Sequence, residues 1–195
     1  MTAPHSSSSG VAAGALILLL ISCGSAPTRI YTLYPVAPAS IAPYAGPPIR
    51  IDAVHVPPAL DRLEVISNIT PGELKVRDLD HWSAPLAEIA KQALSADIVA
   101  RLPPGRVIFP HLAKPEDALG VSVDILDFRT DAKGPSLEAS WTITGSDPGK
   151  VARRGTAQFS ANGSSTDAFA TANALSALLA QLADRIAGDL TQEPR

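Results

Sequence analysis

The residues of this chain that could act in catalysis or bind a metal are its histidines and a group of aspartates. Asp124, Asp127 and Asp131 together suggest a calcium site, but Asp124 and Asp127 point to opposite faces of a strand unless a bulge intervenes. No two histidines have the i, i+4 spacing that places two ligands on one helix face: His5, His55, His81 and His111. The sequence motifs of serine hydrolases, nucleotide-binding loops and zinc proteases are also absent. We therefore predict no catalytic residues, no metal and no cofactor.

The only cysteine, Cys23, follows an apolar run and is the one residue whose position indicates covalent chemistry. Residues 11–21 are eleven consecutive apolar residues. A helix of this length rises about 16 Å, which is half of a hydrocarbon core, so the run is typical of a signal peptide rather than of a membrane span. Directly after it, the segment Leu20-Ile21-Ser22-Cys23 resembles the bacterial lipobox.

The lipobox resemblance implies three modifications at this point of the chain. Diacylglycerol is transferred to the Cys23 thiol, the peptide bond after Ser22 is cut, and the new amino group of Cys23 is acylated. Residues 1–22 are then a lipoprotein signal peptide, although they contain no Lys or Arg, in contrast to most such peptides. Gly24 stands where an aspartate would retain an enterobacterial lipoprotein in the inner membrane. The resemblance therefore implies that the mature protein is attached to the periplasmic face of the outer membrane. Attachment to the inner membrane is the alternative.

Composition limits the classes of partner that the remainder can bind. The 195 residues suit one globular domain with an anchor and a linker, because 46% are hydrophobic and 18% are charged. The formal net charge of −3 excludes the basic surface that nucleic acids require. We expect no nucleic-acid partner.

Residues 23–48 read as the lipidated cysteine and a proline-rich tether. Six prolines favour an extended backbone without a packed core, and such a tether reaches about 75 Å at about 3.1 Å per residue. Inside it, Tyr31 to Tyr34 (YTLY) is an aromatic and aliphatic island. We expect this island to dock on the domain as an edge strand; contact with a partner is the alternative.

Residues 49–191 carry the hydrophobic periodicities of an α/β domain. Two long stretches with apolar residues on one helical face predict helices at 82–102, capped by Ser83, and at 167–190, capped by Ser164 or Ser165, with Phe169 in the apolar stripe. Residues 119–128 are predicted to form a strand, and this strand needs a bulge to bury both Leu126 and Phe128. Alternating or short apolar runs predict strands at 49–56, 64–68, 73–77, 106–109, 119–128, 137–143 and 151–161. The order of elements predicts one domain with helices packed on a mixed sheet.

Three segments in this order resemble the ABC-type transport auxiliary lipoproteins, the PqiC/YmbA-like family. They are Tyr31-Thr32-Leu33 after the lipobox, Val56 to Arg62 (VPPALDR), and Trp82 to Leu86 (WSAPL) before a helix. Many relatives have an acidic residue where this chain has Ala84. The resemblance implies an α/β/α domain similar to the anticodon-binding-like and TolB N-terminal domains. It also implies MCE-domain proteins that bridge the periplasm, with their membrane transporter, as partners.

The function that follows is that of a non-enzymatic subunit of an MCE-type lipid transport system that supports envelope integrity. Such a subunit docks on its partner or forms a homo-oligomeric ring, and its exposed contact candidates are Tyr31, Leu33, Pro57, Leu60, Asp61 and Arg62. The alternative is a structural or assembly lipoprotein, such as a TolB-like scaffold or a cell-wall binder. A periplasmic enzyme would need a convergent polar site, which the sequence does not contain.

Overall fold

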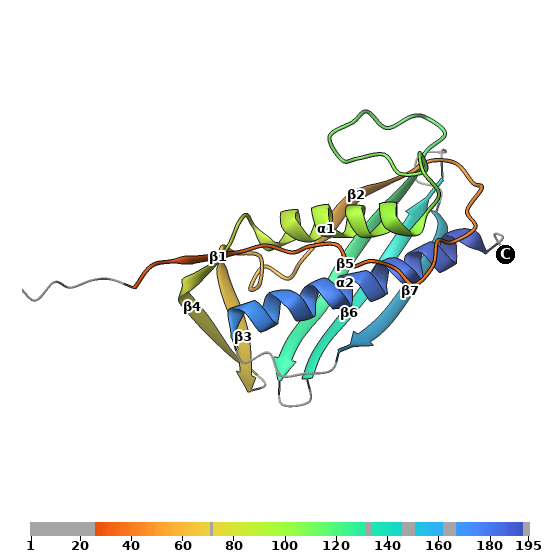
Figure 1. The fold of residues 1–195 in the computed structure, drawn as a ribbon. Coiled ribbons are helices and arrows are strands. Elements are labelled where there is room, and N and C mark those ends of the chain that lie inside the picture. The colour runs from red at the N-terminus through yellow and green to blue at the C-terminus, as the bar shows by residue number, and fades with distance from the viewer. Residues whose placement is uncertain (1–25, 71, 132–133, 146–150, 162–166, 193–195) are drawn as a thin grey trace, which may run out of the picture.

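The fold consists of seven strands and two helices among the residues that the computed structural model describes, which are 26–70, 72–131, 134–145, 151–161 and 167–192. Figure 1 shows their arrangement. The elements are β1 (Arg29–Tyr31), β2 (Ile49–His55), β3 (Glu64–Thr70), β4 (Glu73–Trp82), α1 (Leu86–Arg101), β5 (Leu119–Asp131), β6 (Gly134–Thr144), β7 (Val151–Ser160) and α2 (Ala168–Thr191).

The strands form two sheets. The larger sheet has the order β2-β5-β6-β7, in which β2 and β5 are parallel and the other pairs are antiparallel. The smaller sheet has the order β1-β4-β3, in which β1 runs parallel to β4. The predicted class, an α/β domain with helices packed on a mixed sheet, is confirmed.

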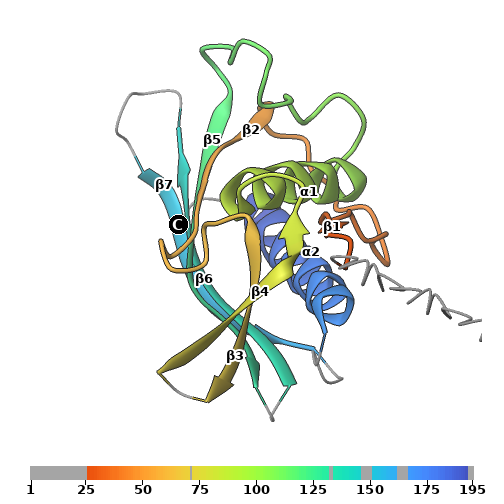
Figure 2. The same cartoon turned by 90° about the vertical axis from the view of Figure 1, so that its left-hand side faces the viewer.

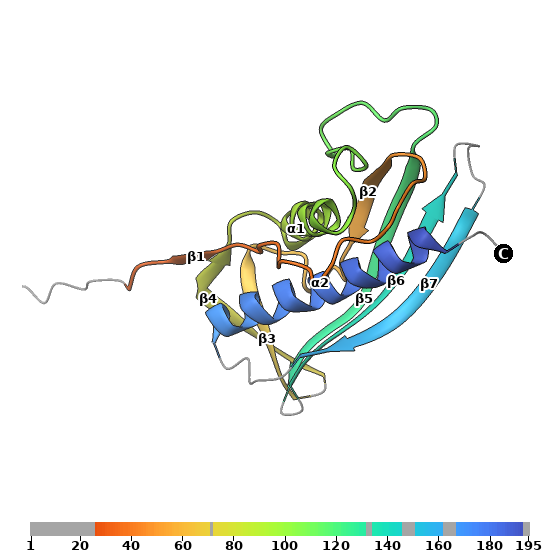
Figure 3. The ribbon, with the colours of Figure 1, turned by 45° about the vertical axis from the view of Figure 1, so that its right-hand side comes forward.

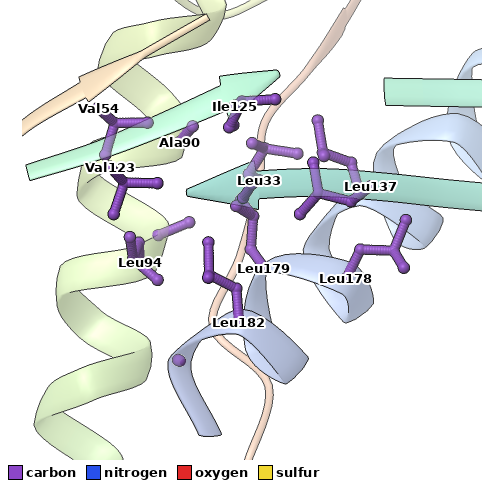
Figure 4. Packing of buried hydrophobic residues seen from close by; sticks show 14 of the residues in the cluster. Leu33, Val54, Ala90, Leu94, Val123, Ile125, Leu137, Leu178, Leu179 and Leu182 are labelled. Carbon is purple, nitrogen blue, oxygen red and sulfur yellow. The ribbon is translucent and has the colours of Figure 1, made fainter. Parts of the chain in front are cut away.

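Both helices lie against the same face of the larger sheet (Figure 2). The inward residues of β6 are buried, from Leu137 to Ile143, while Glu138 on its other face is exposed. Figure 4 shows the core, where Leu94 of α1 and Leu182 of α2 lie near Val123 of β5. A second helical layer, as in an α/β/α arrangement, is therefore absent from the described part of the chain.

The two helices run in the same general direction but cross at an angle, and Figure 3 accordingly shows α1 almost end-on and α2 from the side. The start of each helix lies near β1. The carbonyl of Tyr31 accepts a hydrogen bond from the Ser83 amide, just before α1. The start of α2 also contacts β1. At the other end of the pair, Arg101 of α1 forms an ion pair with Asp184 of α2. The end of the domain that carries β1 is called the β1 end below, and the end where α2 finishes is called the far end.

Residues 32–48, called the strap below, cover the groove between the helices on the side away from the sheet (Figures 2 and 3). Leu33 is 7% exposed and Tyr44 is 6% exposed, and both belong to the core. The Val36 amide donates to Asp97 Oδ1 of α1 at 2.9 Å, and the Ala42 amide donates to the Arg101 carbonyl at 2.7 Å. The prediction of an unpacked tether is therefore wrong for the strap. The island 31–34 docks on the domain as expected, but only Tyr31 of it lies in an edge strand, β1.

Several observed element boundaries differ from the predicted ones. Helix α1 begins at Leu86, and Trp82 is instead the last residue of β4. Ser83 does not cap α1; the Ala87 amide donates to Asp61 Oδ1 at 2.9 Å, so the cap comes from another loop. The predicted strand at 106–109 is reduced to a single bridge between Ile49 and Val107.

The predicted range of α2, 167–190, agrees with the observed helix, and only its N-cap differs from the prediction. Asp167 is the N-cap, and its carboxylate accepts a hydrogen bond from the Ala170 amide at 2.8 Å. The expected caps Ser164 and Ser165 lie outside the described residues. Phe169 was expected in the buried stripe but is 65% exposed, because the stripe begins at Ala168 and Ala172.

The predicted bulge in β5 is present between Ile125 and Asp127. It turns Phe128 into the core but leaves Leu126 exposed, so only one of the two residues gains burial. Asp124 is exposed and Asp127 is half-buried.

Candidate functional site

A pocket of about 280 Å³ lies at the far end, where the strap, the sheet and the last turn of α2 meet. Its wall is predominantly apolar and includes Tyr44, Pro47, Leu119, Ile143, Ala152 and Leu190. Apolar pockets of this size bind small hydrophobic molecules or parts of them. The geometry therefore offers a site for an aliphatic group rather than for a polar substrate.

The polar groups beside this pocket already have partners. Trp141 Nε1 donates to Asp189 Oδ2 at 3.0 Å, and Arg185 lies 3.6 Å from the other carboxylate oxygen. Arg153 donates to the Asp189 carbonyl and, at 2.9 Å, to the Gln192 carbonyl, so it satisfies carbonyls at the end of α2. These bonds stabilise the helix end and leave the apolar wall as the surface available to a ligand.

Tyr44 closes one side of the pocket and holds the end of the strap in place. Its hydroxyl donates to the Pro47 carbonyl at 2.6 Å. Burial raises the pKa of Tyr44, and this effect outweighs the opposite influence of Arg106. The hydroxyl therefore remains a neutral hydrogen-bond donor at physiological pH and cannot serve as a base.

A buried ion-pair network lies beneath the strap. Arg101 Nη1 is 3.1 Å from Asp97 Oδ1, and Arg101 Nε is 2.6 Å from Asp184 Oδ1. Asp97 is fully buried, and its Oδ2 has no hydrogen-bond partner among the described residues. Burial raises the pKa of Asp97, although the hydrogen bond from Val36 and the charge of Arg101 oppose this shift. The network ties the strap to both helices.

The predicted lipid-attachment site, Cys23, and the cleavage site after Ser22 lie outside the described residues. Tyr31 is half-buried, and its hydroxyl donates to Asp80 Oδ1 at 3.3 Å. Leu33 and Leu60 are buried, so the prediction that they are exposed contact residues is wrong. Both belong to the hydrophobic core, because burial of an aliphatic side chain is favourable.

The rest of the predicted contact loop remains accessible but has structural partners. Pro57 is half-buried, and its carbonyl accepts from the Leu60 amide at 2.8 Å. Asp61 caps α1, and Arg62 forms an exposed ion pair with Glu64 at 2.9 Å. The loop therefore presents Pro57, Asp61 and Arg62 at the start of α1.

Sequence reasoning missed the pocket because its wall comes from distant segments. Tyr44, Leu119, Ile143 and Leu190 become neighbours only when the strap, two strands and α2 meet. Each of these residues alone reads as ordinary core. Within the described ranges, no group of three His, Cys, Asp or Glu residues is close enough to hold a metal ion.

Comparison with known families gives a match over most of this structure. The family model for the ABC-type transport auxiliary lipoprotein component matches residues 31–187. The chain belongs to this family. The match begins at Tyr31, the last residue of β1, and ends in α2, so it includes all buried residues of the hydrophobic core.

Two crystal structures share the fold. One is of an uncharacterized protein, with a TM-score of 0.66 and 16% identity, covering 84% of this chain and 99% of that one. The other is of a DUF330 protein from Xanthomonas campestris, with a TM-score of 0.66 and 21% identity, covering 83% of this chain and 93% of that one. None of the curated proteins matches the chain. In the part of the chain that the structure describes, no helix is both long and apolar enough to cross a membrane.

The packing of Trp141 gives a stability prediction. A Cβ at Gly155 would overlap the Trp141 indole, whereas a Cβ at Gly188 in α2 would meet no atom within 4 Å. We expect Gly155→Ala to lower the free energy of unfolding by about 1–3 kcal/mol through overpacking. We expect Gly188→Ala to raise it by about 0.5–1 kcal/mol, because alanine favours helix more than glycine does. Urea unfolding of both variants measures the difference, and equal stabilities would refute this account of the packing.

Proposed function

We propose that this protein is a non-enzymatic lipoprotein subunit of an MCE-type lipid transport system. The family match over residues 31–187 carries the proposal, because that family is an auxiliary component of ABC-type transport. The protein is attached by lipid on Cys23 to the periplasmic face of the outer membrane. There it assists the transfer of lipid between membranes and so supports envelope integrity.

Two structural features support a docking role rather than catalysis. The pocket at the far end is lined by aliphatic and aromatic groups, and the polar groups around it are bonded to one another. No nucleophile is paired with a base in this pocket, which acyl or phosphoryl transfer would need. An apolar pocket suits a hydrophobic ligand or a side chain of a protein partner.

The proposed partner is an MCE-domain protein that spans the periplasm, together with its membrane transporter. The loop that presents Pro57, Asp61 and Arg62, with the neighbouring Tyr31, is the proposed contact surface. Exposed loops held by a rigid scaffold commonly carry binding residues. The subunit binds singly or as a homo-oligomeric ring.

Co-purification tests this function. We expect the tagged native protein, extracted from membranes in mild detergent, to bring down an MCE-domain protein that mass spectrometry identifies. The Cys23→Ser variant is the control, and its recovery of this partner should fall sharply because it no longer shares the membrane. Recovery of the native protein without any MCE-domain protein would contradict the proposal, and recovery with cell-wall components alone would favour the scaffold alternative.

A further inference from the structure

The packed strap shortens the connection between the proposed lipid and the fold. Arg29, the first residue of β1, follows Cys23 by six residues. A fully extended chain spans at most about 3.6 Å per residue, so these residues reach about 20 Å. The domain is longer than this connection, since the 24 residues of α2 alone extend about 36 Å. The β1 end must therefore stay close to a bilayer that holds the acyl chains of Cys23.

This same end exposes large apolar side chains. Ile30 in β1 is 62% exposed, and Phe169 in the first turn of α2 is 65% exposed. Tyr34 is half-exposed, and its hydroxyl donates to Asn173 Oδ1 at 3.2 Å, one turn after Phe169 on α2. Strand β1 and helix α2 contact each other, and Figures 1 and 3 show β1 beside the start of α2. Tyrosine, an aromatic group with one polar tip, is favoured at the level of lipid headgroups, and exposed apolar side chains enter the boundary between headgroups and acyl chains.

Exposed apolar residues occur elsewhere on the domain, and single ones are ordinary on any protein. Ile41 of the strap has the same 62% exposure as Ile30. However, its neighbour Ala42 is bonded to the last residue of α1, so Ile41 lies nearly a helix length from β1. The short connection brings only the residues of the β1 end to the bilayer.

We propose that the β1 end of the domain is a membrane-contact surface in which Ile30 and Phe169 enter the headgroup region of the bilayer. This inference rests on the proposed lipidation of Cys23. It also places the apolar pocket on the side away from that membrane. Leu190 of the pocket follows Ala168 by 22 residues of α2, which is about 33 Å along the helix axis.

Fluorescence quenching in vesicles tests the contact. The lipidated full-length mature protein is reconstituted into phosphatidylethanolamine–phosphatidylglycerol vesicles with or without brominated acyl chains. Phe169→Trp places a fluorophore at the proposed surface, and Phe109→Trp is the matched control. Phe109 is 44% exposed, and the neighbouring Ile108 is bonded to Ile49 at the start of β2, away from the β1 end. The native Trp82 and Trp141 are buried and provide the same background in both variants.

We expect brominated lipid to quench the added emission of Phe169→Trp and to leave that of Phe109→Trp unchanged. Equal quenching of both variants, or quenching of neither, would overturn the membrane-contact surface. Mass spectrometry of the same sample shows whether Cys23 carries lipid, and so distinguishes a failure of the membrane-contact surface from a failure of the proposed function. If Cys23 carries lipid, only the contact surface is wrong; if Cys23 carries none, both proposals fail.

Discussion

Replacing Arg101 by alanine is expected to lower the free energy of unfolding by about 3–5 kcal/mol, since it leaves a buried carboxylate without its charged partner. Arg101 is the link between Asp97, which is fully buried, and Asp184 on the neighbouring helix. It also donates to the Val36 carbonyl at 3.2 Å, so the strap loses one of its attachments. Urea unfolding of the purified protein measures the loss.

Asp184→Ala is the matched control for this prediction. It removes the other end of the same network, but the Asp184 side chain is 58% exposed. Ion pairs that are open to solvent contribute about 0–1 kcal/mol, so this variant should unfold nearly as the wild type does. Similar losses of free energy of unfolding in the two variants would show that the burial of Asp97 does not determine how much this network stabilises the fold.

The pH dependence provides a second test of Arg101→Ala. Because burial raises the pKa of Asp97, its contribution to stability is fully present below the pKa of the unfolded chain and is lost as the pH rises through the raised value. Removing Arg101 raises this pKa further, since a nearby positive charge favours the carboxylate. The stability difference between variant and wild type should therefore shrink as the pH is lowered. A difference that is constant between neutral and acidic pH would contradict this explanation.

Replacing Cys23 by serine is expected to abolish attachment by lipid. A hydroxyl does not take the place of the thiol in the proposed diacylglycerol transfer, so the chain keeps its signal peptide and gains no acyl chains. Each buried methylene contributes about 0.8 kcal/mol to membrane binding, so the loss of several chains removes the anchor altogether. Metabolic labelling with a fatty acid measures this effect, and the labelled band should disappear.

Arg101→Ala also serves as a control for Cys23→Ser. It destabilises the domain without altering the residues before the strap, so its labelling per molecule should match that of the wild type. Unchanged labelling of Cys23→Ser would show that lipid is attached elsewhere or that the labelled band is another protein.

The regular elements could be predicted because their patterns are local. The alternation from Leu137 to Ile143 identifies β6 and its buried face, and the apolar stripe of α2 identifies a helix. The bulge in β5 followed from the expectation that both Leu126 and Phe128 are buried, although only Phe128 is. These features depend on residues close together in the sequence, so periodicity is enough to find them.

The strap could not be predicted because its composition indicated the opposite. Its prolines favour an extended chain, and an extended chain is also what fills the groove between two helices. Burial of Leu33 and Tyr44 depends on Asp97, Ser176 and Arg101, which follow much later in the sequence. The same non-local origin explains why the start of α1 was misplaced, since its cap is Asp61.

The intact mass of the native protein purified from membranes tests the central claim most directly, because the anchor, the short connection and the membrane-contact surface all depend on Cys23. We predict a chain that begins at Cys23 and carries a diacylglycerol and an amide-linked acyl chain on that residue. A chain that retains residues 1–22, or one that carries no lipid on Cys23, would contradict the account.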